Sequence, residues 1–271
     1  MRFSTYCCLL FLMASVSCIT PRAYMMSPLD INTNPYHTLP MSGDSAKSAV
    51  YASLSFNTGG SNQQLKDDVV GGRAELHRAH QFGNFQAFYG AGLSLGNYHV
   101  ADVYHLRDAY YNSLNDTVYH YENANKLYGS YGLYGGINIV IPFGNGRGEW
   151  RMIGLETSFQ KEFGEYVQYR KNLPDSAYNV LAAYDRIFSI GGMTEIVGKT
   201  RNGTEVGYKL AIGSILFPGG DYRGDARYDH PFYVSNTLHV TKQKVTGFLQ
   251  LNAGVHAASF QFGVNYNLGR R

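Results

Sequence analysis

Charged residues are scarce in this chain. Only 16% of its 271 residues are Asp, Glu, Lys or Arg, against about 25% in ordinary soluble domains. The net charge is +3 and no basic cluster lies beside stacking aromatics, which argues against nucleic acid as a partner. Glycine and tyrosine are abundant instead, with 31 and 23 residues. This composition indicates an all-β chain with much interior or membrane-facing surface.

Cysteine is almost absent as well. The chain has Cys7, Cys8 and Cys18 alone, so cleavage before Cys18 leaves one cysteine, at the mature N-terminus. A single cysteine allows neither a disulfide framework nor a cysteine-based zinc site. The sequence also lacks the G-x-S-x-G, H-E-x-x-H and P-loop motifs. We therefore expect no cofactor, no metal site and no enzymatic activity.

The first residues have the pattern of an export signal. Arg2 gives a positive start, and residues 7–16 form an apolar run too short to cross a membrane as a helix. Small residues at 15–17 precede Cys18, which resembles a bacterial lipobox, although this chain has serine where the pattern usually has leucine. We expect residues 1–17 to be a signal peptide and Cys18 to carry lipid such as palmitate. The alternative is an ordinary signal, with an incidental cysteine.

Residues 18–47 show no apolar periodicity. They contain four prolines among serine, asparagine and threonine, a composition typical of an extended segment without packing. We expect a flexible, lipid-anchored tether. No acidic run of the kind found in some surface-export signals follows Cys18, so the tether is expected on the periplasmic side.

From residue 48 onward, apolar and polar side chains alternate with period two. In the stretch 127–141, leucine, isoleucine and tyrosine share one face, while glycine, serine and asparagine share the other. Such alternation predicts β-strands with two different faces. Short turns, such as 201–204, alternate with long polar loops, such as 98–125. This order of connections is typical of an up-and-down membrane barrel.

We therefore predict an all-β fold, a single antiparallel up-and-down transmembrane β-barrel of eight to ten strands over residues 48–271, with long outer loops. Ten strands require 231–242 to form a strand. The small polar residues suit a narrow bore and the apolar ones suit lipid, where a sheet must close to pair its backbone groups. Tyr98, Tyr128, Tyr131 and Tyr166 are expected in an aromatic girdle. The alternative is a secreted or periplasmic β-sandwich.

Taken together, the lipobox-like start, the proline-containing tether, the repeated strands and the ending "FQFGVNYNLG" (260–269) resemble the small outer-membrane β-barrel lipoproteins of Gram-negative bacteria. The resemblance covers nearly the whole chain but includes no diagnostic motif. It implies a location in the cell outer membrane and brings no catalytic residues. Many such barrels end on an aromatic residue, whereas this chain ends in Arg270 and Arg271.

Charged side chains fall on the polar faces of the expected strands, and therefore inside the barrel. Charges of both signs in a narrow lumen must pair, since an isolated charge there is costly. We interpret them as a structural salt-bridge network that closes the bore; the alternative is a polar path for ions or small solutes. The set comprises Arg73, Glu75, His77, Glu156, Glu162, Glu195, Glu205 and Lys209.

Two combinations of side chains are candidates for chemistry. His77 and His80 are three residues apart, so on a strand they face opposite sides and do not share a metal. Ser94 with His77 and Glu75 forms an imaginable hydrolytic set on neighbouring strands, but no spacing makes it specific.

The expected function is structural, adhesive or envelope-organising, with the loops exposed at the cell surface. Outer-membrane lipid is the expected partner. The Tyr- and Asn-rich loop 108–125 also suits a surface protein or glycan ligand. The alternatives are a narrow channel or carrier for small or apolar solutes and a membrane-surface enzyme that modifies lipid.

Overall fold

The computed structural model describes residues 24–30, 34–43, 47–62, 66–106, 118–174, 177–178, 180–216, 222–224, 232–254 and 257–270. The expected signal peptide, residues 1–17, and the expected lipid site at Cys18 lie outside the described residues. Within the described part, no helix is long and apolar enough to cross a membrane.

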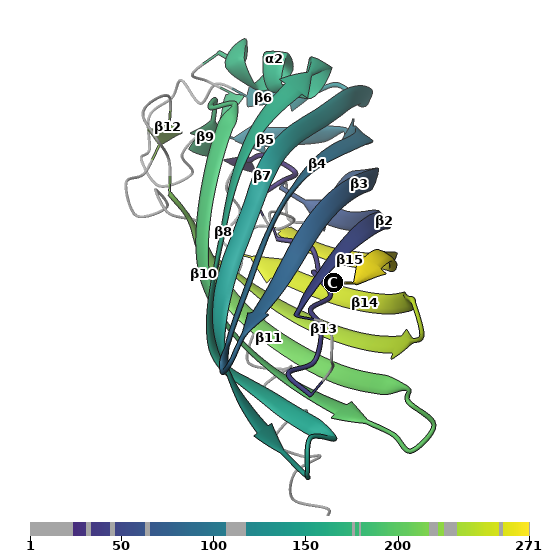
Figure 1. Cartoon of the computed structure of the whole chain (residues 1–271). Coiled ribbons are helices and arrows are strands. Elements are labelled where there is room, and N and C mark those ends of the chain that lie inside the picture. The colour runs from purple at the N-terminus through teal and green to yellow at the C-terminus, as the bar shows by residue number, and fades with distance from the viewer. Residues whose placement is uncertain are drawn as a thin grey trace, which may run out of the picture.

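Ten antiparallel strands close into one barrel (Figure 1), so the barrel prediction is confirmed and the β-sandwich alternative is wrong. Each strand pairs with the next one in the ring, and β15 pairs with β2 to close it. The strand on which the ten-strand count depended is present as β13, over Phe232–Lys242. The strands are β2 (Ser48–Ser61), β3 (Asp67–Phe82), β4 (Phe85–Val100), β7 (Ala124–Phe143), β8 (Gly148–Gly164), β10 (Arg186–Lys199), β11 (Glu205–Leu216), β13 (Phe232–Lys242), β14 (Val245–Gly254) and β15 (Ala257–Arg270).

The two ends of the barrel differ. The short-turn end carries the tight connections after β3, β7, β10 and β13. The loop end carries the connections after β2, β4, β8, β11 and β14, and those after β4, β8 and β11 are the long ones. Further secondary structure belongs to the loop end (Figure 1). It comprises a sheet of β1 (Tyr24–Met25), β9 (Val180–Ala182) and β12 (Tyr222–Gly224), the pair β5 (Val103–Leu106) and β6 (Val118–Tyr121), and the helix α2 (Glu165–Lys171).

The strands bury their polar side chains and expose their apolar ones. In β15, Phe262 and Leu268 are 45% and 54% exposed, whereas Gln261 and Asn265 are 2% and 0% exposed. The same inversion recurs around the ring, so a belt of large apolar side chains encircles the barrel. Water does not favour such a belt, whereas the hydrocarbon of a membrane does.

The expected aromatic girdle is only partly present. Tyr131 is 52% exposed on the outer face, but Tyr98, Tyr128 and Tyr166 are each 3% exposed or less. Tyr98 stacks on Tyr166 with ring centroids 3.7 Å apart, and both hydroxyls bind Asn62. These three tyrosines therefore pack at the loop end, inside the barrel, and the prediction that they contact lipid is wrong.

The N-terminal segment threads the barrel. We call its described residues, 24–30 and 34–43, the lumen segment (Figure 1). It starts at the loop end, where Tyr24 pairs with Val180 of β9 and the Met26 amide donates to Asn62 Oδ1 at 3.1 Å. It finishes at the short-turn end, where the Ser42 amide donates to Glu149 Oε2 at 2.7 Å.

The lumen segment is buried over 25–30 and 34–41, and its last residues, Ser42 and Gly43, reach solvent. Met25, Tyr36 and Met41 are 1% exposed or less. For these residues, the expectation of an extended segment without packing is wrong. Prolines and small polar residues give no periodic signal, because the wall they contact is itself polar.

Candidate functional site in the barrel lumen

All eight charged residues predicted for the lumen have buried side chains inside the barrel, at 8% relative exposure or less. They do not form one connected network. Seven of them belong to local ion pairs, several of whose partners were not identified from the sequence, and the eighth, His77, lies 3.1 Å from the Thr38 carbonyl. The pairs are Arg73 with Glu75, Lys209 with Glu156, Arg170 with Glu162, Arg151 with Glu195, and Lys199 with Glu205.

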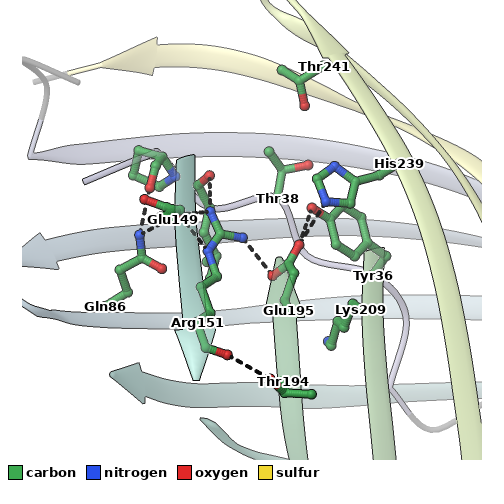
Figure 2. Close-up of polar contacts among 12 residues, drawn as sticks. Tyr36, Thr38, Gln86, Glu149, Arg151, Thr194, Glu195, Lys209, His239 and Thr241 are labelled. Carbon is green, nitrogen blue, oxygen red and sulfur yellow. Dashed lines mark hydrogen bonds and ion pairs between the residues drawn. The ribbon is translucent and has the colours of Figure 1, made fainter. Parts of the chain in front are cut away.

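Arg151 holds the most connected cluster (Figure 2). Its guanidinium lies 2.7 Å from Glu149 Oε1 and 2.7 Å from Glu195 Oε2, and it donates to the Leu39 carbonyl at 3.2 Å. Glu195 Oε1 also accepts from the Tyr36 hydroxyl at 3.1 Å. Two strands and the lumen segment are thus joined through one buried cation.

The cluster extends to His239 of β13. Its Nε2 lies 2.8 Å from Glu195 Oε1, and its ring stacks on Tyr36 with centroids 4.6 Å apart. Lys209 lies 6.0 Å from the centre of the Tyr36 ring. Tyr36 therefore occupies a polar cage in which its ring and its hydroxyl both have partners, as Figure 2 shows.

A β-bulge explains why Arg151 was missed. Strict alternation along β8 gives Arg151 the same face as Ile153, which is 61% exposed to the outside. The register of β8 against both neighbours shifts between these residues, so Met152 is inserted and Arg151 points inward. A bulge changes the face of every residue beyond it.

A second cluster lies around His37. Its ring stacks on Phe88 at 4.7 Å and meets His77 edge-on at 5.0 Å. His37 Nε2 lies 3.5 Å from Glu75 Oε2, and Glu75 Oε1 lies 3.2 Å from Arg73.

The candidate hydrolytic set of Ser94, His77 and Glu75 is not assembled. His77 Nε2 lies 3.1 Å from the Thr38 carbonyl, and the Ser94 hydroxyl bonds to Ser130. His80 points to the outer face, where it stacks near Phe82 at 5.6 Å. Among the described residues, no three His, Cys, Asp or Glu side chains lie close enough to hold a metal.

Beneath α2, the loop end anchors the start of the lumen segment. The Ser27 hydroxyl donates to Glu162 Oε2 at 2.9 Å, and the same carboxylate binds Arg170 of α2. Burial raises the pKa of the Tyr184 phenol well above its usual value, so it stays protonated and donates to Asp30 Oδ1 at 3.1 Å. Neither Arg170 nor Tyr184 was identified from the sequence.

The space between the lumen segment and the wall is small near Thr38. A cavity there measures about 10 Å³ and is lined by Tyr51, Asn267 and Lys244 among others. One water molecule needs about that much volume. A larger cavity of about 260 Å³ lies at the short-turn end, between the connections after β10 and β13.

Comparison with known proteins finds distantly similar structures but no matching family. No family model and no curated protein matches the chain. Three solved barrels are similar: the beta domain of the Bordetella autotransporter Brka, the translocator domain of the autotransporter NalP from Neisseria meningitidis, and the TodX deltaS2S3 mutant monoaromatic hydrocarbon channel. Their identities are 11%, 10% and 8%, and their TM-scores are 0.40, 0.41 and 0.34. The matches cover 82%, 82% and 92% of this chain, and 100%, 89% and 96% of those chains.

Proposed function

We propose that this protein is an outer-membrane barrel closed by its own N-terminal segment, with a structural, adhesive or envelope-organising role. Its outward apolar belt supports residence in a membrane. Its barrel topology supports the outer membrane of a Gram-negative cell, with the loop end at the cell surface. A surface protein or glycan is the proposed ligand of the loops.

One observation supports a closed bore. The lumen segment crosses the bore from the loop end to the short-turn end and bonds to the wall along the way. The Gln250 amide donates to the Asn34 carbonyl at 3.1 Å, the Gln86 amide donates to the Pro40 carbonyl at 2.8 Å, and Asn265 donates to Thr38 Oγ1 at 2.8 Å. A solute path requires this segment to leave.

We also propose that Cys18 carries lipid, with the lipid at the loop end of the barrel instead of the expected periplasmic side. Cys18 precedes Tyr24 by six residues (24 − 18), which span about 20 Å when extended. The hydrocarbon core of a bilayer is about 30 Å thick. Since Tyr24 lies at the loop end, a lipid on Cys18 reaches the leaflet at that end. Labelled palmitate should be incorporated by the full chain and lost in Cys18→Ala.

Ion conductance distinguishes a closed barrel from a channel. The full chain should carry no steady current in a planar bilayer. The variant T38C/N265C, oxidised to lock the lumen segment to the wall, should behave identically. A steady current in the wild type that disappears on oxidation of the variant identifies a gated channel and refutes the closed structural barrel.

A further inference from the structure

The short-turn end carries a group of exposed cations that no ion pair explains. They come from separate connections: the residue before β2 and the turns after β7, β10 and β13. Among the described residues, none of the five forms an ion pair within 4 Å. The group comprises Lys47, Arg147, Arg201, Lys242 and Lys244.

Exposed carboxylates are missing from this end in the part of the chain that the structure describes. Glu149 is 0% exposed and bonds to Arg151, while Glu205 is 8% exposed and lies 3.0 Å from Lys199. The loop end differs, because it has exposed Asp and Glu residues alongside its cations: Asp68, Asp102, Glu122 and Glu165. The short-turn end is therefore positive in its exposed charge.

The cavity of about 260 Å³ lies within this positive end. Lys199 and Lys242, the last residues of β10 and β13, line it together with Asn202 and Gln243 of the turns that follow. Glu205 also lines it, and its carboxylate is paired with Lys199, so Lys242 is the cation of the lining that remains for an anion. Its volume is below the roughly 300–1,000 Å³ of sites that enclose a whole small molecule. It fits a compact anionic group better than a complete solute.

Apolar side chains border these cations. Phe82 and Phe85 flank the turn between β3 and β4 and are 61% and 59% exposed, and Phe143 beside Arg147 is 48% exposed. Large apolar groups next to basic groups at strand ends are the arrangement expected where hydrocarbon meets headgroups.

We propose that the short-turn end binds the phosphate groups of anionic phospholipids in the leaflet at that end, with one headgroup in the cavity between the two hairpins. Basic clusters beside a membrane gain affinity for anionic lipid with each Lys or Arg. A lipid is favoured over a soluble anion because the cations border the apolar belt. The inference rests on the proposed membrane location.

The test uses the full chain in nanodiscs of zwitterionic phosphatidylcholine with a minor fraction of phosphatidylglycerol. Native mass spectrometry measures which lipids stay bound. The wild type should retain phosphatidylglycerol preferentially, and K242Q/K244Q should lose roughly 25-fold in apparent affinity. The matched control K66Q/R186Q, which removes two exposed loop-end cations, should retain the preference.

Each result decides the proposal. Equal retention by the wild type and K242Q/K244Q, or equal loss in both double variants, overturns it. Inorganic phosphate is the second probe: binding of phosphate that depends on Lys242, without phosphatidylglycerol enrichment, also overturns it in favour of a soluble anion. If K242Q/K244Q does not fold, the salt dependence of the wild type replaces it. Raised salt should abolish the preference of the wild type for phosphatidylglycerol, because screening weakens interactions between exposed charges.

Insertion is measured separately, in nanodiscs of phosphatidylcholine alone. A folded barrel that migrates differently before and after boiling shows that the chain enters a bilayer. Failure at this step contradicts the membrane location itself. Insertion without a preference for anionic lipid contradicts the cation site alone.

Discussion

Arg151 is the residue whose loss should destabilise the lumen most. Its side chain is 1% exposed and lies 2.7 Å from each of two carboxylates, those of Glu149 and Glu195. Arg151→Met keeps the approximate length and removes the charge. Removing one partner of a buried ion pair costs about 3–5 kcal/mol, because the other charge is left uncompensated. Here two carboxylates lose their cation, so the free energy of unfolding should fall by at least about 3 kcal/mol.

The triple variant R151M/E149Q/E195Q separates orphaned charge from lost packing. Neutral amides need no cation, so most of the lost stability should return. Urea unfolding in detergent or vesicles measures both effects. Trp150, the sole tryptophan, is 40% exposed to the outside and reports the transition by fluorescence. The reasoning is refuted if Arg151→Met unfolds like the wild type, or if the triple variant is no more stable than the single one.

Two further predictions test the position of the lumen segment and the closeness of the strands. In oxidised membranes, T38C/N265C should form a disulfide, seen as a change in gel mobility that reductant reverses. The control T38C/V264C should form none, because Val264 faces outward and is 48% exposed. A disulfide in the control but not in T38C/N265C would show that the lumen segment does not occupy this position. Gly90→Ala should lower the free energy of unfolding by about 1–3 kcal/mol, since its Cβ would lie 2.5 Å from the Leu76 carbonyl oxygen. Gly247→Ala, with no atom within 4 Å, is the matched control in the same urea experiment, and equal effects at both sites would contradict the steric explanation.

The barrel was predictable because its signal is local and repeated. Period-two alternation assigns faces without knowledge of distant contacts, and β13 follows from the same pattern in 231–242. The alternation fails at bulges, because one inserted residue reverses the faces. Strict alternation along β8 would place Arg151 on the outer face, so the cation of the most connected lumen cluster was not among the predicted residues.

The charges predicted for the lumen already indicated missing partners. Five of them are glutamates, and only Arg73 and Lys209 are fixed cations. A narrow bore cannot hold such an excess of negative charge without additional cations. The structure supplies Arg151 from beyond the bulge, Arg170 from α2 and Lys199 from the end of β10. The imbalance was visible in the sequence, whereas the identity of the compensating residues depended on tertiary structure.

The lumen segment was not predictable from its own composition, because burial against a polar wall leaves no apolar pattern. Its carbonyls serve instead as acceptors for the wall: the Leu39 carbonyl accepts from Arg151, and the Thr38 carbonyl lies 3.1 Å from His77 Nε2. Withdrawal of the segment leaves these wall groups to water, which restores many of the hydrogen bonds at a net cost of about 0.5–1.5 kcal/mol each. It also exposes Tyr36 and Met41. The wall and the lumen segment therefore stabilise each other mainly through many modest contacts. A single substitution of a neutral lumen residue should lower the free energy of unfolding less than the loss of Arg151 does.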